Sequence, residues 1–98
     1  MTLRLVFHPA ARAELREAQE WYEARVAGLG SEFVRAVEAA LMAIQRSPAV
    51  YPVVYEEVRQ AVLRRFPYSL LFILEADSIL LLACFHHRRD PRTWQERA

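Results

Sequence analysis

The chain has 98 residues, of which 54% are hydrophobic, and a formal net charge of +1. This length suits a single domain, 1–98, that buries about two-thirds of its unfolded surface. The sequence contains no run of about 18 uncharged apolar residues, and its first residues lack the pattern of a signal peptide. The single cysteine, Cys84, excludes an internal disulfide and, with only three histidines, argues against a zinc site. We therefore expect a cytoplasmic domain with no metal, no cofactor and no membrane partner.

The charge is divided unequally along the chain. Residues 1–58 contain six arginines and eight glutamates, whereas residues 59–98 contain seven arginines and four acidic residues. This division predicts a basic surface toward the C-terminal end that meets an acidic partner, although an ordinary solvated surface would also explain it. The sequence has no lysine, so every cationic side chain other than histidine is a permanently charged guanidinium.

The first half of the chain predicts one strand followed by two helices. Residues 3–7 form a short apolar run that ends at His8-Pro9, and Pro9 suits the first turn of a helix. Apolar residues then recur at three- and four-residue steps in two stretches, separated by Gly28 and Gly30 and ended by Ser47-Pro48. The two stripes are Ala11, Leu15, Ala18, Tyr22 and Val26, then Leu29, Phe33, Val37, Ala40, Leu41 and Ile44. We expect two antiparallel helices joined by a tight glycine turn.

The second half predicts three strands. Residues 58–66 alternate roughly, residues 68–74 are nearly all apolar after Pro67, and residues 79–85 form another apolar run after the connection 75–78. Short connections favour an antiparallel meander, to which the N-terminal strand can add. The predicted fold class is therefore α+β: a small antiparallel sheet with a helical hairpin packed on one face, in the order β-α-α-β-β-β.

The last two predicted strands are apolar on both faces. A strand covered on one side should alternate apolar and polar residues, yet residues 70–74 and 79–85 are apolar throughout. Because the helices cover only one face, we expect the other face to bind a partner chain or a second copy of this chain. Cover by strand curvature and the C-terminal tail is the alternative. The predicted contact residues on this second face are Leu71, Ile73, Leu81 and Phe85.

The residues that could carry chemistry are densest directly after the last predicted strand. Residues 85–94 read Phe-His-His-Arg-Arg-Asp-Pro-Arg-Thr-Trp. Two histidines beside three arginines could perform acid–base chemistry on a phosphate ester. Adjacent histidines on a strand point to opposite faces, so at most one of His86 and His87 faces any site. The alternatives are a salt-bridged strand end for Arg88, Arg89 and Asp90, and packing for Trp94.

A second basic group, Arg64 and Arg65, lies close in sequence to Tyr68. On a regular strand the two arginines point to opposite faces, so one of them could be structural. Tyr68 could stack on a nucleobase or donate a hydrogen bond, or it could pack in the core. The sequence contains no glycine-rich phosphate loop and no motif of a serine hydrolase or zinc protease.

Five segments of the chain, taken in order, carry a family resemblance. They are Ala13-Glu14-Leu15…Ala18…Trp21-Tyr22, Gly28-Leu29-Gly30…Phe33, Pro48…Tyr51-Pro52, Arg65-Phe66-Pro67-Tyr68, and His87-Arg88-Arg89-Asp90-Pro91…Trp94…Arg97. Together they resemble the ParE/RelE superfamily of plasmid-stabilisation toxins from type II toxin–antitoxin systems. The resemblance implies a RelE/ParE-like fold, a cytoplasmic location and a cognate antitoxin that wraps around the toxin. The antitoxin is the natural occupant of the apolar second sheet face.

The resemblance also implies one of two targets. RelE-like members cut messenger RNA on the ribosome with lysines and arginines of the middle strands and a C-terminal tyrosine, whereas ParE-like members inhibit DNA gyrase by protein–protein contact. Gln60 and Val62 stand where RelE-like members have lysines, and Ser69 stands in place of an arginine. Trp94 replaces the tyrosine, while Arg89 matches. The resemblance is therefore closer to ParE and favours a gyrase inhibitor that is not an enzyme.

The candidate site residues follow from this interpretation. The predicted gyrase-binding residues are Arg64, Arg65, Tyr68, Arg88, Arg89, Arg92 and Trp94. If the chain is instead a ribosome-dependent mRNA endoribonuclease, the predicted catalytic residues are Arg65, Tyr68, His87 and Arg89. A third interpretation is an inactive member that retains only antitoxin binding.

Overall fold

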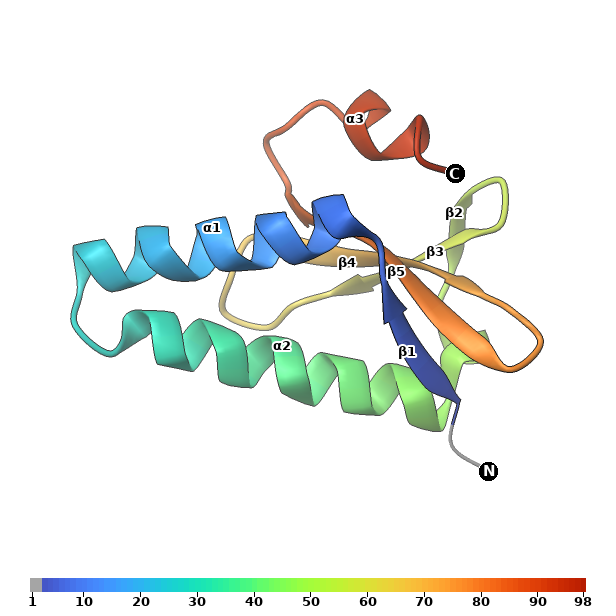
Figure 1. Ribbon diagram of the computed structural model, residues 1–98, viewed down its shortest axis with the longest axis horizontal. Helices are drawn as coiled ribbons and strands as arrows, with labels where there is room; N and C mark the ends of the chain where they lie inside the picture. Colours follow the sequence, from blue (N-terminus) through green and yellow to red (C-terminus); the bar gives the residue numbers. More distant parts are fainter. Residues whose placement is uncertain (1–2) are drawn as a thin grey trace.

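The computed structural model describes residues 3–98; Met1 and Thr2, which belong to the segment tested above for a signal peptide, lie outside the described residues. Two long helices lie side by side and pack on one face of a five-stranded sheet (Figure 1). Within residues 3–98, no helix is long and apolar enough to cross a membrane. The elements are β1 (Arg4–Phe7), α1 (Pro9–Arg25), α2 (Leu29–Arg46), the 3₁₀ helix η1 (Pro48–Val50), β2 (Val53–Tyr55), β3 (Val58–Val62), β4 (Tyr68–Leu74), β5 (Ser78–His86) and α3 (Arg92–Gln95).

The sheet is mixed, and its strands lie in the order β1-β5-β4-β3-β2. Strands β2 to β5 pair antiparallel, which confirms the predicted meander. β1 adds to β5 in the parallel direction, which the sequence prediction had left open, so the sheet as a whole is mixed. The helical hairpin carries the chain away from β1 before the meander forms, and the last strand of the meander returns beside β1 in the same direction. The α+β class and the helix-on-sheet arrangement are as predicted.

The structure differs from the sequence prediction in three short elements and one strand end. The sequence does not predict the 3₁₀ helix η1, the short edge strand β2 or the one-turn helix α3. The strand predicted for residues 58–66 ends at Val62. The residues that follow form the turn that leads to β4, and in this turn Arg65 adopts a positive φ of 71°. The N–H of Leu63 donates to the carbonyl of Tyr68 at 2.9 Å and closes this turn. Arg64 and Arg65 therefore lie on a turn rather than on a strand.

Side-chain contacts define where both helices begin. His8 precedes α1, and its Nδ1 accepts a hydrogen bond from the N–H of Ala10 at 3.0 Å. The carboxylate of Glu23 accepts from the N–H groups of Gly28 and Gly30, both at 2.9 Å, at the start of α2. Gly28 has a φ of 90°, and a Cβ on Gly30 would lie 2.7 Å from the carbonyl oxygen of Gln19. The glycine turn predicted from the sequence is therefore required both for backbone conformation and for close helix packing.

A β-bulge in β5 decides which side chains face the helices. Leu71 pairs with Ala83 and Phe72 pairs with Leu81, so Leu82 is the extra residue. As a result Leu81 packs in the core beneath the helices, whereas Phe85 packs in a cluster on the other face. The prediction that Leu81 and Phe85 share the second sheet face is wrong, because strict alternation does not continue through a bulge.

The second sheet face is largely covered by the chain's own C-terminal tail. Trp94 of α3 is only 5% exposed, and its ring lies edge-on to the rings of Tyr55 and Phe85 at centroid distances of 5.9 and 6.5 Å. Leu71 and Phe85 are buried in this cluster, and only Ile73 among the predicted contact residues on this face is partly exposed. Cover by the tail, the alternative considered from the sequence, therefore accounts for much of the excess apolar surface.

A buried ion pair attaches the tail to the first helix. Arg97 Nη2 lies 2.7 Å from Glu14 Oε2, and the two side chains are 14% and 10% exposed. Glu14 Oε1 also accepts from the N–H of Cys84 at 3.0 Å, and Arg97 Nη1 donates to the carbonyl of Leu82 at 3.0 Å. These two backbone groups lie on the outer edge of β5 beyond the last residue of β1. The ion pair therefore supplies the hydrogen bonds that a longer β1 would have made.

We expect Arg97→Ala to destabilise the fold strongly, because it leaves the Glu14 carboxylate buried without its cationic partner. Breaking a buried pair in this way costs about 3 kcal/mol or more, which for a domain of this size lowers the melting temperature by roughly 10 °C or more. Thermal denaturation followed by circular dichroism measures the effect. Arg92→Ala, which removes an exposed partner of Asp90 on the same tail, is the matched control and should leave the melting temperature nearly unchanged. Equal melting temperatures for the two variants would contradict the structural role of Arg97.

Candidate functional site

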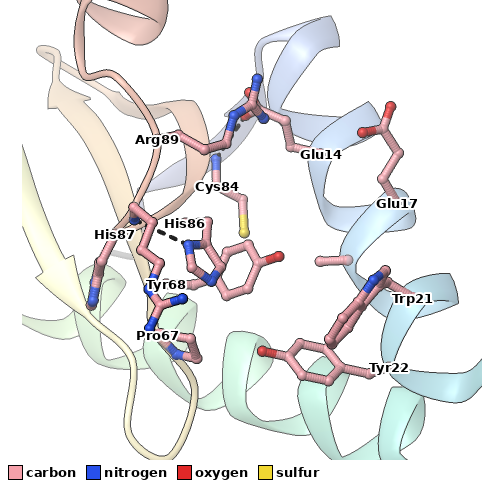
Figure 2. Close-up of a pocket in the computed structure, with 12 residues that line it drawn as sticks. Glu14, Glu17, Trp21, Tyr22, Pro67, Tyr68, Cys84, His86, His87 and Arg89 are labelled. Carbon is pink, nitrogen blue, oxygen red and sulfur yellow. Dashed lines mark hydrogen bonds between the residues drawn. The ribbon is translucent and has the colours of Figure 1, made fainter. Parts of the chain in front are cut away.

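A cleft lies between α1 and the adjoining ends of β4 and β5 (Figure 2). It has a volume of about 680 Å³. Helix α1 forms one wall, the start of β4 forms part of the floor, and the end of β5 with the residues that follow forms the other wall. The lining residues are Glu14, Glu17, Ala18, Trp21, Tyr22, Pro67, Tyr68, Cys84, His86, His87, Arg88 and Arg89.

The floor of the cleft is aromatic. The ring of Tyr68 lies 5.3 Å from that of Phe33, 6.2 Å from that of Tyr22 and 5.0 Å from the imidazole of His86, in edge-to-face contacts. Tyr68 is half-buried, and burial raises the pKa of its phenol above the ordinary value. Trp21 stands at the outer end of α1, about half exposed, with the guanidinium of Arg25 over its ring at 4.4 Å. Tyr68 is thus a packing residue that still presents one edge to the cleft.

The wall opposite α1 is basic. Arg88 and Arg89 are exposed and follow directly on β5. The N–H of Arg88 donates to Nδ1 of His86 at 3.0 Å, which fixes the turn after the strand. The guanidinium of Arg89 lies 5.8 Å from the centre of the Phe85 ring. Both arginines are therefore held by a strand end and remain accessible to a partner at the rim of the cleft.

The two histidines occupy different environments. His86 packs against Tyr68 on the cleft side. His87 forms a hydrogen bond through Nε2 with the hydroxyl of Ser69 at 2.8 Å, and Ser69 is the buried neighbour of Tyr68 whose side chain points to the other face of β4. Both histidines line the cleft, but only the ring of His86 packs against Tyr68, and His87 lies beyond the end of β5.

The residues predicted as ribonuclease candidates are brought together only in part. Tyr68 faces the cleft, whereas the ring of His87 is bonded to Ser69 on the opposite side of β4. Arg65 lies beyond the end of β3, and its Nη2 donates to Glu32 of α2 at 2.8 Å. This hydrogen bond and the charge of Arg65 lower the pKa of the Glu32 carboxyl. Tyr68, His87 and Arg89 all line the cleft, whereas Arg65 does not.

Besides Arg65, two further predicted gyrase-binding residues have local structural partners. Trp94 is buried against Tyr55 and Phe85, so the packing role, the alternative considered from the sequence, is the one that the structure gives it. Arg92 Nε donates to Asp90 Oδ2 at 2.9 Å, and the backbone N–H of Arg92 donates to Asp90 Oδ1 at 3.0 Å. The side-chain and backbone hydrogen bonds from Arg92 lower the pKa of the Asp90 carboxyl. The salt bridge foreseen at the strand end therefore involves Arg92 rather than Arg88 or Arg89.

Sequence reasoning missed the contribution of α1 to the cleft. The sequence assigns no site role to Glu14 or Glu17, and it places Tyr22 in an apolar helical stripe. The spacing of Glu14, Ala18 and Tyr22 by four residues does place them on one helix face, but nothing in the sequence shows that this face meets the end of β5. The role of Arg97 was missed because its partner Glu14 is 83 residues away.

Cys84 lies in the inner wall of the cleft and should not react as a free thiol. Burial, and to a lesser extent the nearby Glu14 carboxylate, raises the pKa of the Cys84 thiol to about 12. At pH 8 about one such thiol in 10,000 is ionised, compared with about a quarter of the thiols in an unfolded chain. We expect iodoacetamide to modify the folded protein at pH 8 at least about a hundredfold more slowly than the denatured protein. Ser31→Cys, which adds an exposed thiol, controls for reagent activity, and rapid modification of native Cys84 would contradict this prediction.

Comparison with known proteins identifies the family. The family described as "ParE toxin of type II toxin-antitoxin system, parDE" matches residues 5–91. A chain from the solved structure of a chromosomal ParDE TA system from P. aeruginosa superposes with a TM-score of 0.74 at 20% sequence identity, covering 87% of this chain and 96% of that chain. At this identity the likeness establishes the fold. No curated protein matches the sequence. Because the family match spans most of the chain, and the sheet and helical hairpin agree with it, the protein belongs to the ParE toxin family of type II toxin–antitoxin systems.

Proposed function

We propose that this toxin inhibits DNA gyrase by protein–protein contact and is neutralised by a cognate antitoxin. Membership of the ParE family supports a toxin with an antitoxin partner. The solved ParDE system of P. aeruginosa, which shares the fold, supports the same assignment of a partner. Contact with gyrase goes beyond family membership, and the geometry of the cleft supports it.

The observation that carries this proposal is that the ribonuclease candidates do not direct their functional groups toward one point, although three of them line the cleft. Acid–base cleavage of RNA needs its proton-transfer groups and its charge-stabilising groups within hydrogen-bond reach of one phosphate. Tyr68 lies in an aromatic floor, His87 is bonded to Ser69 on the other side of β4, and Arg65 is paired with Glu32. A protein contact makes no such demand, because it needs only an accessible surface of complementary shape and charge.

The rim of the cleft offers that surface. Arg88 and Arg89 project from a strand end, and neither has a carboxylate within salt-bridge distance among residues 3–98. Trp21 supplies a half-exposed aromatic ring at the outer end of the opposite wall. Arginine and tryptophan are the residue types most often found at the energetic centre of protein interfaces. We infer that the cleft rim, defined as Arg88, Arg89 and Trp21, contacts an acidic, partly apolar surface of gyrase.

We expect the double variant Arg88→Glu/Arg89→Glu to inhibit gyrase at least about tenfold less well than the wild type, because reversed charges repel an acidic surface. The measurement is DNA supercoiling by purified gyrase over a range of toxin concentrations. Arg16→Glu is the matched control, since Arg16 is an exposed arginine on α1 outside the cleft lining. It should inhibit like the wild type, and both variants should melt like the wild type.

The same proteins are tested for messenger cleavage on translating ribosomes. Supercoiling unaffected by the wild-type toxin, together with cleaved messenger, would show that the chain is an endoribonuclease and that the gyrase proposal is wrong. Normal growth of cells that express the toxin without its antitoxin, with neither reaction detected, would identify an inactive member that retains only antitoxin binding.

A further inference from the structure

The cleft carries opposite charges on its two walls. Helix α1 contributes two carboxylates, Glu14 and Glu17, to one wall. The wall that follows β5 carries the arginines Arg88 and Arg89. Glu14 is already bound by Arg97, whereas Glu17 is exposed and belongs to none of the ion pairs found within residues 3–98. Glu17 is therefore the carboxylate of the cleft that can meet a cation from a partner.

The phenol of Tyr68 on the cleft floor senses the charges of both walls. Burial is the main cause of its raised pKa, and smaller contributions come from the charged side chains around it. The guanidinium of Arg89 lowers the pKa of Tyr68, whereas the carboxylate of Glu17 raises it. Figure 2 shows Glu17 on α1 and Arg89 on the facing segment. No ion pair of the described residues joins these two side chains, so the cleft is electrically polarised across its floor.

Aromatic rings lie beside Glu17. Trp21 follows Glu17 by four residues on α1, so the two side chains lie on the same face of the helix. The rings of Trp21 and Tyr22 meet at 86° with centroids 5.2 Å apart, and those of Tyr22 and Tyr68 meet at 63° with centroids 6.2 Å apart. All three residues line the cleft. Rings at such angles form an aromatic corner, defined by Trp21, Tyr22 and Tyr68, rather than a parallel slot.

The aromatic corner and Glu17 together suit a compact cation. Aromatic ring faces attract cations, and a neighbouring carboxylate adds a full negative charge. Trp21 already makes such a contact, because the guanidinium of Arg25 lies 4.4 Å from the centre of its ring. A planar guanidinium stacks best on parallel rings, whereas a compact ammonium fits rings that meet at steep angles. The apolar stem of a lysine can also pack along an aromatic floor while its ammonium reaches the carboxylate.

We propose that the cleft receives a lysine side chain of the target protein, with the ammonium held by Glu17 and the aromatic corner. The inference rests on the proposed function for the identity of that protein, gyrase, but not for the chemistry of the site. Acidic side chains of the same target surface meet Arg88 and Arg89 on the other wall. A purely acidic segment would be repelled by Glu17, so the two walls together fix the orientation of the partner.

A direct test needs no gyrase. Isotope-labelled toxin is titrated at low salt with acetyl-lysine methylamide and with acetyl-norleucine methylamide, which has the same stem but no ammonium. Nuclear magnetic resonance follows the indole N–H signals of Trp21 and Trp94. The Trp21 signal should shift with the lysine compound only, and the signal of Trp94, which is buried on the other sheet face, should not move. Equal shifts with the norleucine compound, or an unchanged Trp21 signal with both, would overturn the proposal.

Variants of Glu17 separate its charge from its shape. Glu17→Gln should weaken binding of the lysine compound at least about threefold, because it removes the charge and keeps the volume. Glu17→Lys should inhibit gyrase at least about tenfold less well than the wild type, because the introduced ammonium repels the incoming lysine. Glu20→Gln and Glu20→Lys are the matched controls, since Glu20 is an exposed glutamate of α1 outside the cleft lining. The controls should behave like the wild type, and all four variants should melt like it.

The lysine site and the proposed function fail in different ways. Selective binding of the lysine compound that is weakened by Glu17→Gln, together with full gyrase activity in the presence of wild-type toxin, would support the lysine site and refute gyrase as the target. Equal inhibition of gyrase by the wild type and Glu17→Lys would overturn the lysine site and leave the proposed function intact.

Discussion

The central constraint on this structure is that the outer edge of β5, beyond Leu81, has backbone hydrogen-bonding groups that no neighbouring strand pairs. β1 pairs with β5 only as far as Phe7, because the chain turns at His8 into α1. Past that point the carbonyl of Leu82 and the N–H of Cys84 are buried without a neighbouring strand, and unpaired buried backbone groups are costly. Arg97 and Glu14 satisfy them, and the two side chains neutralise each other's charge. One contact thus links the first helix, the last strand and the C-terminal tail.

The contact between Arg97 and Glu14 positions the C-terminal tail, and the tail then covers the rest of the second sheet face. With Arg97 bound at the bulge, α3 lies over the sheet, and Trp94 covers Phe85 and Leu71. The same bulge reverses the side-chain alternation of β5, so that Leu81 enters the helix-facing core while Leu82 and Ala83 both face the tail. The apolar character of β5 on both sides is therefore used within one chain, by the helical hairpin on one face and by the tail on the other.

Two surfaces remain for partners, and they differ in chemistry. The cleft joins an aromatic floor to a basic rim that is fixed by the end of β5. A groove between α2 and the end of β3 joins an alanine-lined wall to the last residues of that strand. They share the β3–β4 connection, whose buried Phe66 packs against Tyr22 and Phe33. On the function proposed above, the toxin presents the charged rim of the cleft to its target, and the connection between β3 and β4 is the segment that the two surfaces share.

The sequence alone determined the class of the fold and the family. Helical periodicity, the Gly28–Gly30 turn and the apolar runs of β4 and β5 are local patterns, and local patterns can be recognised in a single sequence. The same holds for the density of arginines after β5. Only the tertiary structure decided which face each side chain meets, because a single inserted residue, Leu82, reverses the alternation. It alone decided that Trp94 packs inward, that His87 turns away from Tyr68, and that Glu14 and Arg97 meet across 83 residues of chain. Each of these depends on contacts between distant segments, and no local periodicity encodes such contacts.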